Sequence, residues 1–261
     1  MKTILNKNSA NELIDQNCIE IFLSKDVGSI DPLAFHHCFQ LQSINVSPDN
    51  LYFTSIHGVL FSKDEKQLIC CPPDHQSNEY TIPSTVTEIN DSAFSYCSNL
   101  TIITIPYSVV SIGKSAFSCC RNLHSLVVES TNPKFFSLDG ILLTKDIRSL
   151  VCCPEKNNIS VYISPINITS IAQYAFYGCK HLVSITLPES VLEVGDYAFA
   201  CCHSLKEMIL PKSLNVIGYA AFSGCINLDS FIFPSGLRSI GPFAFSNCSK
   251  LESIEIPESL S

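Results

Sequence analysis

The stretch "SAFSYCSNLTIITIPYSVVSIGKSAFSCCRNL", which runs from Ser92 to Leu123, repeats its own pattern after 23 residues. Each copy contains an Ala-Phe pair, a Cys three residues after the Phe and a Leu three residues after the Cys. The Phe of such pairs recurs along the chain at positions 35, 94, 117, 176, 199, 222 and 245. Most successive positions differ by 23, and the two wider gaps, 35 to 94 and 117 to 176, are equal to each other. A 23-residue unit is therefore interrupted twice by an insertion of fixed length.

The two insertions have matching sequences. The stretch "NLYFTSIHGVLFSKDEKQLICCP" from Asn50 aligns without a gap with "NPKFFSLDGILLTKDIRSLVCCP" from Asn132. In each, two apolar runs flank a Lys-Asp pair, which favours a β-hairpin. We therefore predict hairpins at about residues 48–76 and 130–158, placed beside the main stack.

The 23-residue unit has the apolar spacing of a strand followed by one or two helical turns. Alternate apolar residues such as Ile103 and Ile105 have the two-residue period of a strand, and the Pro that follows lacks a ladder donor and ends it. The Gly-x-x-Ala-Phe-x-x-Cys part spaces its apolar residues by three or four, which predicts a short helical return. A single unit cannot bury its apolar edge, whereas stacked units place Leu on Leu and Phe on Phe.

These features predict a β-rich α/β solenoid with a parallel sheet and two β-hairpin insertions. Strands are expected before Ser47, Pro83, Pro106, Glu129, Pro165, Pro188, Pro211, Pro234 and Pro257, which gives about nine coils. At about 4.8 Å per coil the sheet would be roughly 40 Å long.

The pattern L-x-x-I-x-I-P-x-x-V-x-x-I-G-x-x-A-F-x-x-C-x-x-L closely resembles leucine-rich repeats of the BspA type. The resemblance covers residues 29–261, and it implies a right-handed superhelix with the parallel sheet on its concave side. Departures are local: Ser47 and Glu129 stand where other units have the strand-ending Pro. Residues 1–28 match no unit, so we interpret them as an N-terminal capping segment.

Composition favours a folded chain with a substantial core. The 261 residues are 46% hydrophobic and 15% charged, which is too apolar for disorder. The formal net charge is −8, and the absence of any run of Lys or Arg argues against nucleic acid as a partner. No apolar stretch has the length of a signal-peptide core near the start or of a membrane span later, so we expect neither.

Seven of the fourteen cysteines occupy one slot, three residues after the Phe: Cys38, Cys97, Cys120, Cys179, Cys202, Cys225 and Cys248. Stacked coils place them in one interior column, where we expect reduced and buried thiols. Disulfides within this column are disfavoured, because neighbouring coils hold the Cβ atoms about 4.8 Å apart whereas a bridge needs roughly 3.5–4.5 Å.

The vicinal pairs Cys70-Cys71 and Cys152-Cys153 lie at matching places in the two insertions. Adjacent strand residues face opposite sides, so we expect one thiol of each pair to be exposed. Zinc needs four converging ligands, but the sequence contains no Cys-x-x-Cys and the two insertions are three coils apart. We therefore predict no metal site.

No motif indicates catalysis or a cofactor. The stretch His36-His37-Cys38 places two imidazoles beside a thiol, but aligned units carry Ser95-Tyr96 or Ala200-Cys201 at the histidine positions, which marks a variable outer turn. Gly-x-Ser-x-Gly, a phosphate-binding glycine loop and His-Glu-x-x-His do not occur in the sequence. We predict no catalytic residue, no cofactor and no enzymatic activity.

The outward side chains of the parallel sheet are the best candidates for a binding site. Residues two and four after the Leu of each unit should point outward between buried neighbours. We predict that a protein partner binds the concave face in the C-terminal half, formed by Val183, Thr186, Glu207, Ile209, Asp229, Ser230, Ile232, Glu252 and Glu255. The alternative is that the isoleucines are only good strand formers on a neutral surface.

A long solenoid without catalytic motifs favours a protein-interaction module. BspA-type proteins occur on the surfaces of bacteria and protozoan parasites and are associated with adhesion to host cells and to matrix proteins such as fibronectin and fibrinogen. The resemblance therefore implies a surface adhesin or antigen, whereas the lack of a signal peptide favours an intracellular leucine-rich repeat scaffold. The chain stops at Ser261 just after a strand, so either further repeats follow or this C-terminal edge associates with another molecule.

Overall fold

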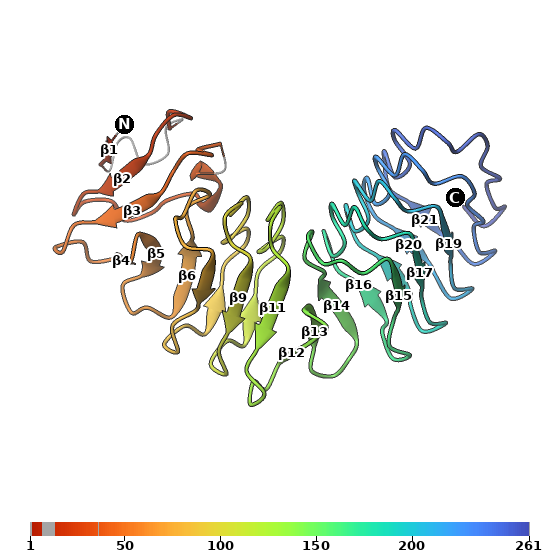
Figure 1. Cartoon of the computed structure of the whole chain (residues 1–261), viewed down its shortest axis with the longest axis horizontal. Helices are drawn as coiled ribbons and strands as arrows, with labels where there is room; N and C mark the ends of the chain where they lie inside the picture. Colours follow the sequence, from red (N-terminus) through yellow and green to blue (C-terminus); the bar gives the residue numbers. More distant parts are fainter. Residues whose placement is uncertain (1, 7–13, 36, 261) are drawn as a thin grey trace. The chain divides into compact units, whose positions relative to one another are not determined.

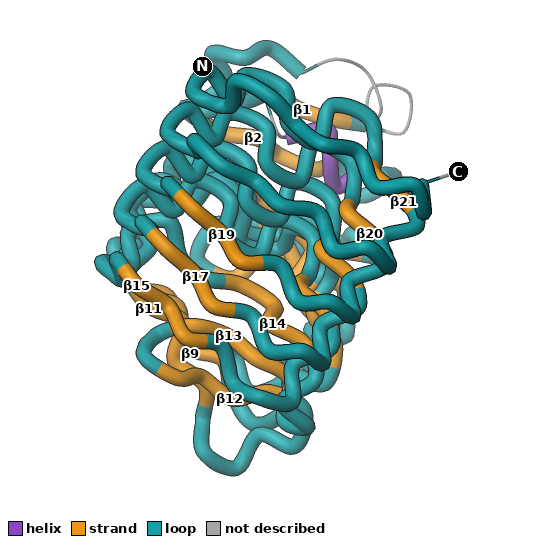
Figure 2. The backbone as a smooth tube through the Cα atoms, turned by 90° about the vertical axis from the view of Figure 1, so that its right-hand side faces the viewer, coloured by secondary structure: helices purple, strands orange, loops and turns teal. Residues whose placement is uncertain are grey.

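The computed structural model describes residues 2–6, 14–35 and 37–260, which form a solenoid with parallel sheets as predicted. The chain folds as two compact units, Met1–Leu123 with Val128–Lys134 and His124–Val127 with Phe135–Ser261. In each unit, short strands lie side by side in successive coils (Figure 1). The described residues contain no α-helix, and their one helical segment is the 3-10 helix η1 (Pro32–Phe35), drawn in purple in Figure 2.

Two kinds of sheet build the first unit. The first kind is parallel. One parallel sheet contains β1 (Lys2–Leu5), β2 (Glu20–Leu23) and β3 (Ser43–Val46), and in another β7 (Glu79–Thr81) pairs with β9 (Ile102–Ile105). The other kind has five strands in the order β10-β8-β6-β5-β4. These are β4 (Phe53–Ile56), β5 (Val59–Ser62), β6 (Gln67–Cys70), β8 (Glu88–Ile89) and β10 (Ser111–Ile112).

The second unit repeats this arrangement. Its parallel sheet consists of β15 (Val161–Ile163), β17 (Ser184–Thr186) and β19 (Glu207–Ile209). Its other sheet has seven strands, β12 (Phe135–Leu138), β13 (Ile141–Thr144), β14 (Ser149–Cys152), β16 (Ser170–Ile171), β18 (Glu193–Val194), β20 (Val216–Ile217) and β21 (Ser239–Ile240). Strand β11 (Ser125–Val128) lies where the chain passes between the units. The segments around Ile232 and Glu255, predicted as strands, follow the coil without forming them.

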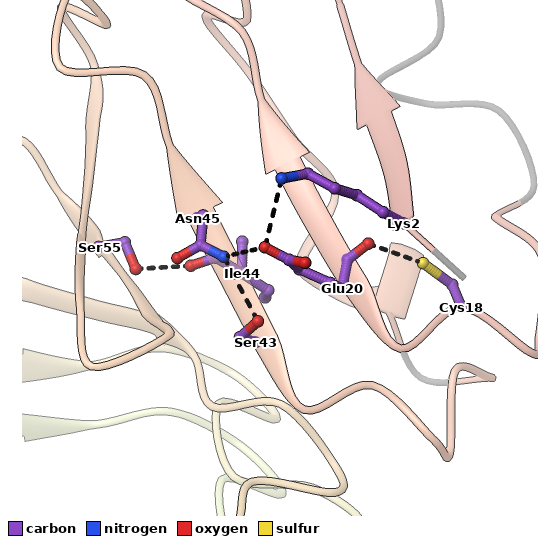
Figure 3. Close-up of polar contacts among 7 residues, drawn as sticks. All are labelled: Lys2, Cys18, Glu20, Ser43, Ile44, Asn45 and Ser55. Atoms are coloured by element: carbon purple, nitrogen blue, oxygen red, sulfur yellow. Dashed lines mark hydrogen bonds and ion pairs between the residues drawn. The ribbon is translucent and has the colours of Figure 1, made fainter.

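The segment predicted as an N-terminal cap supplies β1 and β2, which extend the sheet beyond β3. In the register of these strands Lys2 lies opposite Glu20, and Glu20 opposite Ser43. The Glu20 carboxylate lies 3.4 Å from Lys2 Nζ and accepts a hydrogen bond of 2.8 Å from the Asn45 side chain (Figure 3). These polar contacts and the buried side chain of Ile21 hold the segment on the first coil. Residues 1 and 7–13 of the predicted cap lie outside the described residues.

Aromatic rings form the interior column that the repeat predicts. In the second unit the stacked rings are those of Phe176, Phe199, Phe222 and Phe245, with successive centroids 5.0, 5.3 and 5.3 Å apart. In the first unit Phe94 stacks on Phe117 at 5.6 Å. Because each of these rings is 23 residues apart from the next in its stack, each ring covers the face of its neighbour.

The helical return predicted for the Ala-Phe segment is wrong. The residue before the Ala and the residue before the Cys both have positive φ, for example Tyr197 at 55° and Cys201 at 60°. A left-handed residue at every fourth position prevents a continuous α-helix. Neighbouring amides instead alternate in direction, because Phe199 N–H donates to Ala221 O of the next coil at 2.7 Å and Ala200 N–H donates to Tyr197 O of its own turn at 3.1 Å. The turns thus bond successive coils to one another.

The antiparallel hairpins predicted in the insertions are present, with one strand more than expected. Strand β13 pairs antiparallel with both β12 and β14, and β5 does the same with β4 and β6. Their predicted position beside the stack is wrong, because β14 pairs in parallel with β16 and β6 pairs in parallel with β8. The last strand of each insertion therefore belongs to the coil.

The vicinal cysteines take the place of the Ala-Phe pair in these long coils. Cys153 N–H donates to Ala175 O at 2.6 Å, just as Phe176 N–H donates to Ala198 O at 2.7 Å one coil later. Cys71 makes the corresponding bond to the next coil at 2.7 Å. Since 153 plus 23 is 176 and 71 plus 23 is 94, Cys71 and Cys153 stand in the Phe column. Each insertion is thus a lengthened repeat, and the core continues through it.

Candidate protein-interaction face

The outer side of β15, β17 and β19 displays two columns of side chains in register. One column contains Val161, Ser184 and Glu207, and the other contains Ile163, Thr186 and Ile209. The alternate residues of the same strands, Tyr162, Ile185 and Met208, are buried. With Ser230, Ile232 and Glu255 of the next two coils, these two columns form what we call the second-unit sheet face.

Isoleucine dominates the second column of this face. The side chains of Ile163, Ile209 and Ile232 are 74, 77 and 82% exposed. Strand propensity explains why β-branched residues occur here, but it does not require them to be aliphatic at exposed positions, where Thr186 serves equally well. The face therefore carries apolar surface that a partner could bury.

Two neighbouring hollows lie on this face. The first has a volume of about 440 Å³ and is lined by residues that include Glu207, Ile209, Lys212 and Ile232. The second has a volume of about 550 Å³ and is lined by residues that include Asp229, Ile232 and Glu255. They share Ser230, Ile232, Phe233 and Ser235. A chain lying across successive coils would contact both hollows, because Ile232 forms a wall of each.

The two hollows differ in charge. The first contains one carboxylate, Glu207, and one ammonium group, Lys212. The second contains Asp229 and Glu255 and is lined by no basic residue. Within the described part of the chain, no ion pair joins any of these three carboxylates to a basic side chain. The second hollow is therefore the more acidic end of the face.

The structure brings together most of the predicted site residues. Six of the nine line the two hollows, namely Glu207, Ile209, Asp229, Ser230, Ile232 and Glu255. Thr186 and Glu252 are exposed but line neither hollow. Val183, expected to add exposed apolar area, is half-buried.

Four residues at this face are absent from the predicted set, and one of them is Ser184 of the first column. Val161 is 60% exposed and extends the face with Ile163, and Lys212 lines the first hollow. In the coil that contains β15, Ile159 stands at the position of the Leu that aligns the other units, so the predicted columns skip this coil. Its Val-Tyr-Ile alternation before Pro165 is the signal that locates it.

The cysteine column is buried as predicted. None of the fourteen cysteines forms a disulfide in this structure, and the seven in the slot after the Phe are buried. Their thiols also donate to carbonyl groups of the preceding coil, as Cys120 does to Phe94 O at 2.9 Å and Cys202 to Phe176 O at 3.0 Å. Burial raises the pKa of Cys38 to about 11 and holds the pKa of Cys202 well above its ordinary value of 9.0. These raised pKa values keep the thiols of Cys38 and Cys202 protonated at neutral pH in the folded chain.

The exposure predicted for one thiol of each vicinal pair holds only in part. Cys70 and Cys71 are both buried at the end of β6, and Cys70 belongs to the core of the first unit. In the second insertion Cys153 is buried and Cys152 is half-buried.

Over residues 2–6, 14–35 and 37–260, no group of three or more His, Cys, Asp or Glu side chains is arranged to hold a metal ion. The same residues include no helix long and apolar enough to span a bilayer. His36, one of the imidazoles considered as a base, lies outside the described residues.

The comparison with known protein families identifies the repeats of this chain. The family model for the BspA type leucine rich repeat region matches in six copies over residues 70–137 and 148–261. No curated protein matches the chain.

Three solved structures are similar over most of the chain. A leucine rich cell surface protein from Faecalibacterium prausnitzii matches with TM-score 0.65 and 21% identity, covering 99% of this chain and 78% of that one. The pneumococcal vaccine antigen PcpA matches with TM-score 0.55 and 22% identity, and a leucine-rich repeat protein from Eubacterium ventriosum with TM-score 0.52 and 22% identity. Each of these two matches covers 94% of this chain and 62% of the other protein. These likenesses concern the fold.

Proposed function

Because the chain belongs to the BspA-type leucine-rich repeat family, we propose that it is a non-enzymatic protein-binding module that holds its partner on the second-unit sheet face. The observation that carries this proposal is the row of exposed isoleucines, Ile163, Ile209 and Ile232, beside two adjoining hollows. The backbone of the parallel sheet fixes Ile163 and Ile209 in one column, so binding to them costs little side-chain entropy.

Charge gives the face its selectivity. An apolar centre flanked by Glu207, Asp229 and Glu255 suits a partner segment that has apolar side chains and a basic flank. A second copy of the same face would bring like charges together, which disfavours face-to-face pairing. Binding should therefore weaken as salt screens the acidic residues.

The cellular role proposed is that of a surface adhesin or antigen that contacts host cells or matrix proteins. Support comes from the family and from two similar structures, one described as a cell surface protein and the other as a vaccine antigen. An intracellular scaffold is the alternative. Antibody labelling of intact, unpermeabilised cells separates the two, because only a surface protein is labelled without permeabilisation.

The binding site is tested with the double substitution Ile209→Lys and Ile232→Lys. We expect it to reduce binding to fibronectin or to a cell-surface extract at least tenfold, because it places two charges in the apolar column. Leu192→Lys is the matched control, since Leu192 is an exposed leucine of the same unit beside β18 and away from the face. Unchanged affinity in a folded double variant would place the site elsewhere.

A further inference from the structure

A cysteine of each long coil lies beside a cysteine of the coil that follows it. Among the described residues, two successive ordinary coils have no such pair of thiols. Between ordinary coils the Cys thiol meets the carbonyl of a Phe in the preceding coil, as Cys225 does with Phe199 at 3.1 Å. In each long coil, a Cys stands where that Phe would be. The next coil therefore places Cys97 against Cys71 in the first unit and Cys179 against Cys153 in the second.

Both thiols of each pair converge on one carbonyl oxygen. Cys71 Sγ and Cys97 Sγ lie 3.9 and 3.5 Å from the oxygen of Pro72. In the second unit, Cys153 Sγ and Cys179 Sγ lie 3.9 and 3.8 Å from the oxygen of Pro154. The same arrangement thus occurs twice, once in each unit.

The two sulfurs of each pair are thus neighbours around one carbonyl oxygen, and each pair shows this proximity in its pKa values. Burial is the main cause that raises the pKa of Cys97, and a hydrogen bond to the Cys71 side chain adds to it. For Cys179 the hydrogen bond to the Cys153 side chain is the largest cause of the raised pKa. The spacing that disfavours bridges within the cysteine column does not apply here, because the partners come from two different columns and both thiols approach the same carbonyl oxygen.

We propose that Cys71–Cys97 and Cys153–Cys179 are two disulfide-forming sites, which close when the chain folds in the presence of a small-molecule disulfide such as oxidised glutathione. Each bond would join a long coil to the coil that follows it. The remaining ten cysteines, fourteen minus four, would stay as thiols. The cross-links would therefore lie where the regular Phe stacking is interrupted.

The chemistry is thiol–disulfide exchange in two steps. The Cys97 thiolate attacks one sulfur of oxidised glutathione and releases one glutathione thiolate, leaving a mixed disulfide. The Cys71 thiolate then attacks the Cys97 sulfur and releases the second glutathione. Two protein thiols are thereby oxidised to one disulfide while oxidised glutathione is reduced to two thiols. The step occurs before the coils close, since only thiolates react and the folded core keeps the thiols protonated.

The experiment is refolding of the denatured, reduced chain in a mixture of reduced and oxidised glutathione, followed by alkylation and peptide mapping. Refolding in dithiothreitol is the parallel control. We expect ten alkylated cysteines and two linked pairs in the glutathione sample, and fourteen alkylated cysteines in the control. Cleavage at Glu79 or Glu88 separates Cys71 from Cys97, and cleavage after Lys156 separates Cys153 from Cys179.

Single substitutions assign each link. Cys97→Ser should remove only the first link and Cys179→Ser only the second, whereas Cys202→Ser should leave both. Cys152→Ser shows whether the second link uses Cys153 or its neighbour. The oxidised chain should also unfold at a higher temperature than the reduced chain. Fourteen alkylated cysteines after refolding in glutathione, or links such as Cys202–Cys225 at equal yield, would overturn the proposal.

Discussion

The ring of Tyr162 lies 5.6 Å from the ring of Phe176, at the place in the aromatic column where Cys153 leaves no ring of its own. In the first unit, Tyr80 lies 5.6 Å from Phe94 in the same way, beside Cys71. A tyrosine from the parallel sheet thus fills the space that the smaller cysteine leaves in each long coil. This replacement extends the column of rings into each long coil.

Substitutions of Cys153 and Tyr162 test whether these two side chains share one space in the core. Cys153→Phe should destabilise the protein by about 1–3 kcal/mol, because Tyr162 already occupies the space. Tyr162→Ala should cost about 3–5 kcal/mol through the cavity it creates. The double variant should be more stable than the sum of both losses, which a double-mutant cycle of urea unfolding measures. Additive losses would show that the two side chains do not share a site.

The hydroxyl of Tyr162 gives a second prediction for the same residue. Its Oη atom is buried and has no hydrogen-bond partner among the described residues, and burial raises the pKa of the phenol to about 12. Tyr162→Phe keeps the ring and removes the unsatisfied hydroxyl, so it should be neutral or stabilising by about 1 kcal/mol. Thermal unfolding of this single variant is sufficient, and a clear loss of stability would indicate that the hydroxyl has a partner.

The stacked phenylalanines should carry much of the stability of the second unit. Phe199→Ala should lower the free energy of unfolding by about 3–5 kcal/mol, because the ring is fully buried between two others. Phe243→Ala is the matched control, since Phe243 is 65% exposed and should cost less than about 1 kcal/mol. Equal effects of the two substitutions would contradict an interior column.

The sequence predicts the phase of the repeat and the column of rings, because the same residues recur at fixed spacing. It does not predict the left-handed turns, because apolar residues three or four apart fit both a helix and these turns. The informative signal is the residue before the Cys, which is Gly at 178 and 224, where φ is 69° and 75°. Tyr96 and Cys119 adopt the same conformation without a glycine, which obscures the pattern.

The candidate site is also predicted only in part. Alternation along a strand identifies Ile209 and Ile232 as outward residues, and the structure agrees. The hollows depend on how the turn with Lys212 packs beside the next coil, which no periodicity encodes. The place of Cys153 in the Phe column has one signal in the sequence, its distance of 23 residues from Phe176, but the change from Phe to Cys obscures it.

Stability should fall at alkaline pH because of the buried thiols. The folded-state pKa of Cys202 is raised above 9.0 by burial, so the unfolded chain loses its proton first as the pH rises. The stabilising contribution is thus complete below about pH 9 and is lost as the pH rises toward the folded-state value. Each such thiol contributes a slope of about −1.4 kcal/mol per pH unit in this window. Urea unfolding at pH 7 and pH 10 should show a smaller decrease for Cys202→Ala than for the natural chain.

Association through the C-terminal edge stays a prediction. Strand β21 is the last strand of its sheet, and Ile256 beyond it is 72% exposed. Unpaired backbone groups and exposed apolar residues at a sheet edge favour pairing with another molecule. Sedimentation analysis should therefore show self-association at high concentration that Ile254→Lys with Ile256→Lys removes. A monomer at all concentrations, unaffected by the substitutions, would count against it.

Removal of one whole coil tests the solenoid itself. Deletion of residues 200–222 removes 23 residues and joins Phe199 to Ser223, which restores the Ala-Phe-x-x-Cys pattern and the phase of every column. Because each coil contacts only its neighbours, the shortened chain should fold with the same circular dichroism and a modestly lower melting temperature. Deletion of residues 200–219 leaves three extra residues in the turn and shifts Phe222 and Cys225 out of their columns, so this variant should not fold cooperatively. The in-phase deletion also removes Glu207 and Ile209, and it should therefore abolish the proposed binding while preserving the fold.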